Sequence, residues 1–298
     1  AAHNGFLFIF GKRQILVYQG ATAPSTMSLY DTVIGIGCQW RDSIQSTNTD
    51  VVFLSNSGVR SIMRTIQEKS APFRDLTKNV RNDLMQLVAG EDPDNIKAVY
   101  SELDAFYLLT LPTAGQVYVL DTRAVMQDGS SRITTWTHID PTALYARRNG
   151  DLLIGKTGYV GKYSGYLDDT DTYRMAYYTN HADLGDVTVT SIVKRISIVV
   201  IGGSDQVVTI KWGYDFSENY LSANVSIPTQ GVSEYGIAEY GANGVPVAYY
   251  AGGITIQTLT TQATGSGKVV QTGYEAEVNG YELSIQKIEI LAKHGRIS

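Results

Sequence analysis

AFYLLTLPTAGQVYVLD, residues 105–121, places two apolar runs on either side of a Pro-Thr-Ala-Gly turn. Runs of roughly four to eight β-branched, aromatic and aliphatic residues that end in turn residues predict a β-hairpin. Three more segments have this form, an apolar run, a glycine-containing turn and a second run: FLFIFGKRQILVYQ (6–19), VVFLSNSGVRSIMR (51–64) and DLLIGKTGYVGKYSG (151–165). We therefore predict an all-β fold.

The four hairpins recur at a nearly fixed interval. Their first runs are 46, 54 and 46 residues apart when they are aligned on Phe6, Val52, Phe106 and Leu152. A hairpin that recurs every roughly 40–50 residues is typical of the four-stranded blades of a β-propeller. We predict propeller-like blades in a domain over residues 1–185. A generic sandwich or barrel is the alternative, because any antiparallel β protein contains several hairpins.

The wider interval contains one segment with helical periodicity, DLTKNVRNDLMQLVA (75–89). Its apolar residues recur at the spacing of one helix face: Leu76, Val80, Leu84, Leu87 and Val88. Asp75 opens the segment, and Gly90 and Pro93 follow it, as is typical of the two ends of a helix. We predict one amphipathic helix, inserted between strands and with its polar side exposed to solvent.

After about residue 186 the apolar runs become longer, as in TVTSIVKRISIVVIG (188–202). Several of them alternate apolar and polar residues; in SIQKIEI (284–290) the three isoleucines reach one face only if the strand contains a β-bulge. Long alternating strands joined by Gly-rich loops predict a second domain, residues 186–298, that is like a β-sandwich with one solvated face.

The loop TQGVSEYGIAEYGANGVP (229–246) is poor in charge and repeats Glu-Tyr-Gly at 234–236 and 239–241. It is either disordered or a contact between subunits, and we favour the contact, because interfaces are enriched in Tyr and depleted of charge. The whole chain has the same bias, with 20 Tyr and 18% charged residues, against about 25% charged in average domains. We expect other subunits to cover much of its surface.

The 298-residue chain has 24 Lys and Arg against 29 Asp and Glu, a net charge of −5, which argues against a protein that grips nucleic acid through bulk charge. No apolar run approaches the roughly 20 residues of a membrane-spanning helix, so we predict no membrane insertion. One cysteine, Cys38, excludes an internal disulfide, and the four histidines have none of the usual spacings of a zinc site.

Few residues suggest chemistry. GSGK (265–268) lacks the leading Gly and the final Ser or Thr of a Walker A motif, and we predict a hairpin turn there. Asp168, Asp169 and Asp171 either form a solvated turn or hold a hard cation through their carboxylate oxygens; we favour the turn, because the spacing of an EF-hand is missing. We assign no catalytic, cofactor-binding or metal-binding residue.

Between residue 6 and about residue 180 the segments occur in an order and spacing that resembles the tail nozzle proteins of short-tailed bacteriophages, also called tail tubular protein B, tail hub or DNA-stabilisation proteins. The segments that carry this resemblance are FIFGKRQILVYQGAT (8–22), VIGIG (33–37), DVVFLSNSGVRSI (50–62), DLTKNVRNDL (75–84), AFYLLTLPTAGQVYVLDTR (105–123), TTW (134–136), GYVGKYSG (158–165) and YRMAYYTN (173–180).

The resemblance implies a structural virion protein without enzymatic activity or cofactor. It implies a homohexameric ring beneath the portal and the adaptor, or head-to-tail connector, with a channel through which the genome leaves. The partners would be the adaptor, tail fibres or tailspikes, and genomic DNA that passes without sequence-specific binding. The location would be the phage tail, assembled in the host cytoplasm, with the second domain as platform or tube.

The family tends to be longer than this chain, and Ala1 leads almost directly into the apolar run at residues 6–10. We therefore expect the propeller-like domain to be incomplete at its N-terminus. The alternative function is a glycan-binding or capsule-depolymerising β-propeller, for which exposed aromatic residues and convergent carboxylates at one face would be needed.

Overall fold

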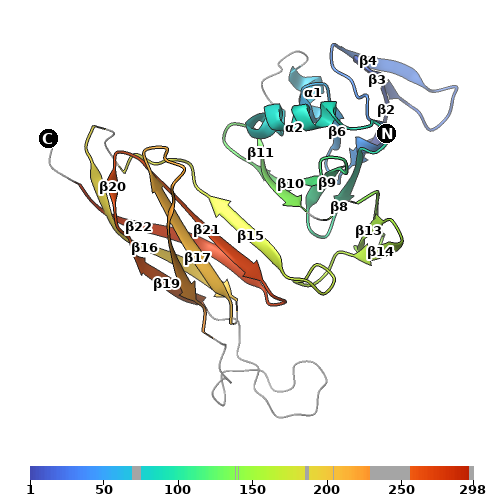
Figure 1. Cartoon of the computed structure of the whole chain (residues 1–298). Helices are drawn as coiled ribbons and strands as arrows, with labels where there is room; N and C mark the ends of the chain where they lie inside the picture. Colours follow the sequence, from blue (N-terminus) through green and yellow to red (C-terminus); the bar gives the residue numbers. More distant parts are fainter. Residues whose placement is uncertain are drawn as a thin grey trace, which may run out of the picture. The chain divides into compact units, whose positions relative to one another are not determined.

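In the computed structural model, 55% of the described residues lie in strands and 8% in helices, so the predicted all-β class is confirmed. The chain forms two compact units, Ala1–Tyr163 and Ser164–Ser298, which are described separately (Figure 1). The structure describes residues 1–68, 75–137, 139, 141–184, 188–203, 205–228 and 256–294.

Four antiparallel sheets follow one another along the first unit, and within each sheet the strands pair with their neighbours along the chain. Sheet 1 contains β1 (Ala2–His3), β2 (Phe6–Phe10), β3 (Gln14–Gln19) and β4 (Ser28–Ile34). Sheet 2 contains β5 (Gln45–Ser46), β6 (Val51–Ser55) and β7 (Gly58–Ser61). Sheet 3 contains β8 (Lys97–Ser101), β9 (Phe106–Leu111), β10 (Gln116–Val125) and β11 (Ser131–Thr137). Sheet 4 contains β12 (Ala143–Ala146), β13 (Leu152–Lys156) and β14 (Tyr159–Lys162).

The repeat predicted from the sequence is confirmed at the level of the sheets. The aligned residues each lie in the second strand of their sheet, β2, β6, β9 and β13: Phe6, Val52, Phe106 and Leu152. The sheets pack face to face in series, because successive pairs share a hydrophobic core. Core residues shared in this way are Phe8 with Phe53 for sheets 1 and 2, Leu54 with Tyr107 for sheets 2 and 3, and Leu108 with Leu152 for sheets 3 and 4.

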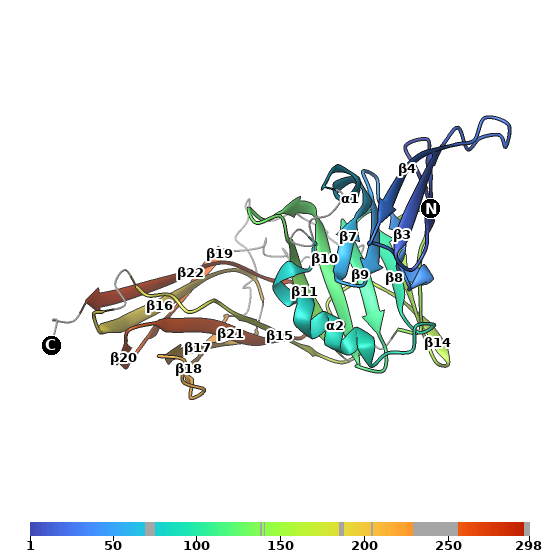
Figure 2. The same cartoon turned by 90° about the horizontal axis from the view of Figure 1, so that it is seen from above.

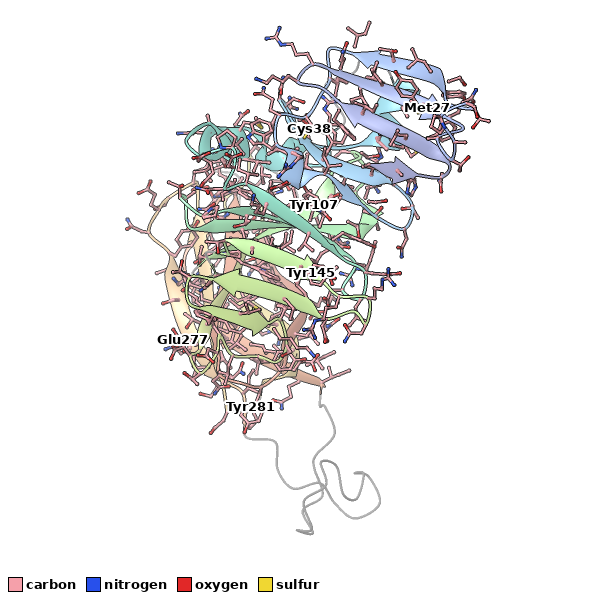
Figure 3. The ribbon with its side chains drawn as sticks, turned by 90° about the vertical axis from the view of Figure 1, so that its right-hand side faces the viewer. Met27, Cys38, Tyr107, Tyr145, Glu277 and Tyr281 are labelled. Atoms are coloured by element: carbon pink, nitrogen blue, oxygen red, sulfur yellow. The ribbon has the colours of Figure 1, made fainter. Side chains whose placement is uncertain are left out.

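Figure 3 shows this series, with Cys38 near the first two sheets, then Tyr107 in sheet 3 and Tyr145 in sheet 4. Face-to-face packing of small antiparallel sheets in chain order is the arrangement of consecutive propeller blades. Closure of the series into a propeller stays a prediction.

One predicted hairpin ends early. The second run of segment 51–64 forms β7 only as far as Ser61, and a helix that the sequence analysis missed, α1 (Ile62–Glu68), follows directly. The Ser61 hydroxyl accepts the N–H of Arg64 at 3.3 Å, and a carboxyl oxygen of Asp50 accepts the N–H of Met63 at 3.1 Å. These two acceptors satisfy donors of the first helical turn, so the chain leaves the strand at this serine.

The helix predicted at 75–89 is shorter than expected. A 3-10 turn, η3 (Lys78–Val80), leads into α2 (Arg81–Ala89), and α2 lies next to β10 and β11 in both views (Figures 1 and 2). Leu84 and Val88 are buried in the core that sheets 2 and 3 share, so the predicted apolar face is confirmed for this part. A second 3-10 turn, η1 (Arg41–Ser43), lies between sheets 1 and 2 in the chain.

The predicted start of this helix is wrong because the backbone of Leu76 pairs elsewhere. Its N–H donates to the carbonyl of Val59 at 2.8 Å, and its carbonyl accepts the N–H of Ser131 at 2.9 Å. Leu76 therefore links sheet 2 to sheet 3. Asp75, predicted to open the helix, is fully buried and pairs with Arg81.

The second unit is a β-sandwich, as predicted. Its sheet 5 has the order β15 (Tyr173–Tyr178), β21 (Val270–Val278), β17 (Val207–Tyr214) and β18 (Leu221–Ser226). Its sheet 6 has β16 (Ser191–Gly202) between β19 (Ile256–Gln262) and β22 (Leu283–His294), with the short β20 (Ser266–Gly267) also paired to β16. One core lies between the sheets and includes Ile196, Ile198 and Leu259 of sheet 6 with Ile210, Trp212 and Ala276 of sheet 5.

The boundary between the units differs from the predicted one at residues 185 and 186. It lies after Tyr163, because β15 pairs with β21 along six positions and thereby belongs to the sandwich. The β-bulge predicted in SIQKIEI is confirmed. Neighbouring residues of β16 lie opposite Ile285 and Lys287, which leaves Gln286 as the extra residue.

Candidate functional surfaces

Sheet 1 has one face that packs against sheet 2 and one that points away from it. Side chains alternate between the two faces along a strand. Phe8 of β2 and Ile15 and Val17 of β3 are buried against sheet 2, so the residues next to them in each strand belong to the outer face. We call this the sheet 1 outer face, and strand register places on it Ala2, Leu7, Ile9, Gln14, Leu16, Tyr18, Leu29, Thr32 and Ile34. It is mostly apolar and open to solvent, with Ile34 77% exposed and Leu29 54% exposed.

Sheet 4 ends the series in the same way. Its buried side, with Leu152 and partly buried Leu144 and Ile154, packs against sheet 3. The opposite side is the sheet 4 outer face, and strand register places on it Ala143, Tyr145, Leu153, Gly155, Val160 and Lys162. Tyr145 is 61% exposed and Val160 71% exposed. Lys162 is neutralised by Asp151, with Nζ and Oδ1 2.7 Å apart.

In sheets 2 and 3, which lie between sheets 1 and 4 in the series, both faces are covered by other elements. Every residue of β6 in sheet 2 and of β9 in sheet 3 is buried, since another element covers each face of these sheets. The two outer faces have the same apolar character but remain in solvent. Contiguous exposed apolar surface of this kind marks sites of interaction with other proteins.

A charged cluster lies on sheet 5. Glu275 of β21 accepts from Lys211 of β17 at 2.7 Å and pairs with Arg174 of β15 at 2.6 Å, and it also accepts from the Tyr178 hydroxyl. Burial opposes ionisation of Glu275, but these donors outweigh it and lower its pKa to about 2. A carboxylate held this firmly in its ionised form does not serve as a proton donor near neutral pH. The cluster ties three adjacent strands together.

The one cysteine lies in a buried polar group. The Cys38 thiol donates to the carbonyl of Trp40 at 3.1 Å and lies 3.5 Å from the Ser43 hydroxyl, and burial raises its pKa. The thiolate is the reactive form of cysteine, so a buried thiol with a raised pKa is inert. Cys38 therefore contributes to packing.

The acidic cluster forms the turn that the sequence predicted. Asp168 and Asp171 exchange both backbone hydrogen bonds, at 2.9 and 3.0 Å, around Asp169, which has a φ of 59°. Within the ranges that the structure describes, no group of three or more His, Cys, Asp and Glu side chains is placed to hold a metal ion.

The hairpin predicted at 265–268 is wrong. Strands β19 and β21 on either side of it belong to different sheets, so the segment crosses the sandwich. Asp215 fixes its end, because its Oδ1 accepts the N–H groups of Lys268 and Val269 at 2.7 and 3.1 Å.

The two outer faces were not predicted from the sequence. A signal was present in FLFIF (6–10), whose apolar residues do not alternate with polar ones and therefore occupy both faces of the strand. The loop at 229–246, expected to contact other subunits, lies outside the described residues.

None of the helices in the described part of the chain has the length and apolar character needed to cross a membrane. No protein-family model matches this sequence, and no curated protein matches it.

Proposed function

We propose that this protein is a structural subunit of the tail nozzle of a short-tailed bacteriophage. In this proposal a homohexameric ring lies beneath the portal and the adaptor in the virion, and the genome leaves through its channel. Tail fibres or tailspikes attach at its outside. The protein carries out no reaction and uses no cofactor.

The observation that carries the proposal is the series of four small antiparallel sheets packed face to face in chain order, followed by a separate β-sandwich. Exposed apolar residues such as Ile34 of sheet 1 and Val160 of sheet 4 provide surface that other parts of an assembly can cover. The order of the segments shared with tail nozzle proteins supports the phage assignment.

The charge of the chain also supports a conduit for DNA. A net charge of −5 on 298 residues gives passing phosphate groups little overall attraction, so that the genome is not held back.

Native mass spectrometry and negative-stain electron microscopy of the purified protein, alone and with the adaptor ring, test the proposal. We expect closed rings around an axial opening. A protein that stays monomeric at every concentration and does not associate with the adaptor contradicts it. Release of reducing sugar from capsule polysaccharide would favour the depolymerase alternative instead.

A further inference from the structure

We infer that Asn4 is a site of spontaneous deamidation, at which the side-chain amide is converted through a cyclic succinimide into aspartate and isoaspartate. The inference does not depend on the proposed function. The dipeptide Asn-Gly occurs four times in the chain, at Asn4, Asn149, Asn243 and Asn279, and Asn243 lies outside the described residues. The other three differ in how their reacting groups are held, and this difference singles out Asn4.

The reaction takes place within the chain. The backbone nitrogen of the residue after the asparagine attacks the carbonyl carbon of the side chain, and the new C–N bond closes a five-membered ring. The amide nitrogen leaves as ammonia, with the proton that the backbone nitrogen gives up. Water then opens the ring at either of its two carbonyl groups and yields aspartate or isoaspartate. A following glycine favours the attack, because it has no side chain in the way and permits many backbone conformations.

At Asn149 both reacting groups are engaged in hydrogen bonds. The N–H of Gly150, which contains the attacking nitrogen, donates to the carbonyl of Arg147 at 3.0 Å. The Asn149 side chain is held by Asp151: its Nδ2 donates to Oδ2 of Asp151 at 2.9 Å, and its Oδ1 accepts the N–H of Asp151 at 3.2 Å. Attack at Asn149 therefore requires that the turn between β12 and β13 opens first.

At Asn279 both groups are also engaged. The N–H of Gly280 donates to the carbonyl of Tyr166 at 3.1 Å. The side-chain Oδ1 of Asn279 accepts from Nε2 of Gln206 at 2.8 Å, and Gln206 is itself only 2% exposed. Partners from distant parts of the chain thus hold the attacking nitrogen and the amide that it would attack.

At Asn4 neither group is held. Asn4 and Gly5 form the two-residue turn between β1 and β2, with φ of 48° and 78°, as in the type I′ turns that favour Asn-Gly. In the part of the chain that the structure describes, neither the Gly5 N–H nor the Asn4 side chain forms a hydrogen bond. Both residues are exposed, and β1 is only two residues long. Such a turn opens locally at low cost and can reach the conformation that the attack needs.

The isoaspartate product would change the hairpin. Its main chain runs through the side-chain carbon, which adds one atom to the two-residue loop that sets the pairing of His3 with Phe6. We expect β1 to separate from β2 as a result. The N–H of Phe8 would then lose its acceptor, the carbonyl of Ala1 at 2.8 Å.

Incubation of the folded protein at mildly alkaline pH, followed by proteolysis and mass spectrometry of the peptides, tests the site. Asn149 and Asn279 are matched controls within the same chain, because each also precedes a glycine. We expect deamidation at Asn4 to be at least about tenfold faster than at either control, where two or more hydrogen bonds must break first. In urea, which unfolds the chain and removes these bonds, the three rates should become similar.

Two further measurements test the route and its consequence. The enzyme L-isoaspartyl methyltransferase should methylate the Asn4 peptide of the incubated protein, because direct hydrolysis of the amide would give aspartate alone. Ion exchange separates the modified protein through its added negative charge, and hydrogen-deuterium exchange should then be faster at the N–H of Phe8 than in the unmodified protein.

The inference is overturned if Asn149 or Asn279 reacts as fast as Asn4 in the folded protein, or if Asn4 yields no isoaspartate. Unchanged exchange at Phe8 in the isoaspartate form would overturn the separation of β1 from β2.

Discussion

Tyr107 is completely buried, so its hydroxyl needs a partner inside the protein. It donates to the carbonyl of Ser43 at 2.7 Å, and burial holds the pKa of the phenol well above its ordinary value. The Ser43 hydroxyl donates to the carbonyl of Trp40 at 2.7 Å and accepts the N–H of Leu54 at 3.1 Å. Ser43 of η1 is thus bonded both to Leu54 of sheet 2 and to Tyr107 of sheet 3.

Tyr107→Phe should lower the free energy of unfolding by about 1–3 kcal/mol, because a buried carbonyl loses its donor while packing is kept. Urea unfolding followed by circular dichroism measures the change. Tyr145→Phe is the control, since that ring is exposed and should change stability by less than about 0.5 kcal/mol. Equal effects of the two substitutions would show that the buried hydrogen bond contributes nothing.

Asp75 should make stability fall as pH rises above its ordinary pKa of 3.8. Burial raises its pKa in the folded protein, and Arg81, with Nε 3.2 Å from the carboxyl oxygen, offsets this only in part. The folded chain then holds the proton more tightly than the unfolded chain. The stabilisation is therefore complete below the unfolded pKa and is lost as pH rises through the folded one.

Asp75→Asn removes this titration. Relative to wild type, the variant should gain stability as the pH of urea unfolding experiments is raised from about 3 to about 7. If the stability of the variant relative to wild type stays constant or falls as the pH rises, the assignment is contradicted.

At the scale of elements, Glu275 joins β15, β21 and β17 through Arg174, Tyr178 and Lys211. Its pKa of about 2 lies below the ordinary 4.5, so its stabilisation is present above pH 4.5 and is lost as pH falls through 2. Solvent screens this interaction, because the Arg174 side chain is 61% exposed, so the ionised Glu275 contributes less to the free energy of unfolding than its pKa alone would suggest.

Glu275→Gln should cost about 1–2 kcal/mol at neutral pH and less in acid. Glu277→Gln is a control on the same strand and the same face, where the carboxyl accepts from Thr172 at 3.3 Å and is exposed. Urea unfolding at neutral and acidic pH compares the two. A loss at Glu275 that does not exceed the loss at Glu277 would refute the role of the cluster.

Elements whose formation depends on residues close together in the chain were predicted from the sequence pattern. The four hairpins follow from apolar runs and turn residues, and the bulge at Gln286 follows from the spacing of three isoleucines. The start of α2 depends instead on backbone bonds from Leu76 to Val59 and Ser131, which are distant in the chain. The start of α1 does have a local signal in the sequence, the capping residue Ser61.

At the scale of the molecule, the sequence predicted that other subunits cover much of the surface, and the one contact that it named, the loop at 229–246, lies outside the described residues. The outer faces become visible only when strand register assigns Ile9 and Leu16 to the side of sheet 1 away from sheet 2. The high Tyr content and low charge of the chain do not distinguish one part of the surface from another. Neither signal indicates the number of subunits in a ring, because that depends on the rotation between neighbours.

The two units have separate cores, which predicts that the sandwich folds on its own when the chain is cut at the right residue. Fragment 164–298 keeps β15, whereas fragment 186–298, cut at the boundary expected from the sequence, loses it. Without β15, strand β21 becomes an edge, and Glu275 loses two of its donors. We expect cooperative urea unfolding of the longer fragment and a loss of more than about 2 kcal/mol in the shorter one. Equal stability of the two fragments would mean that β15 is not part of the sandwich.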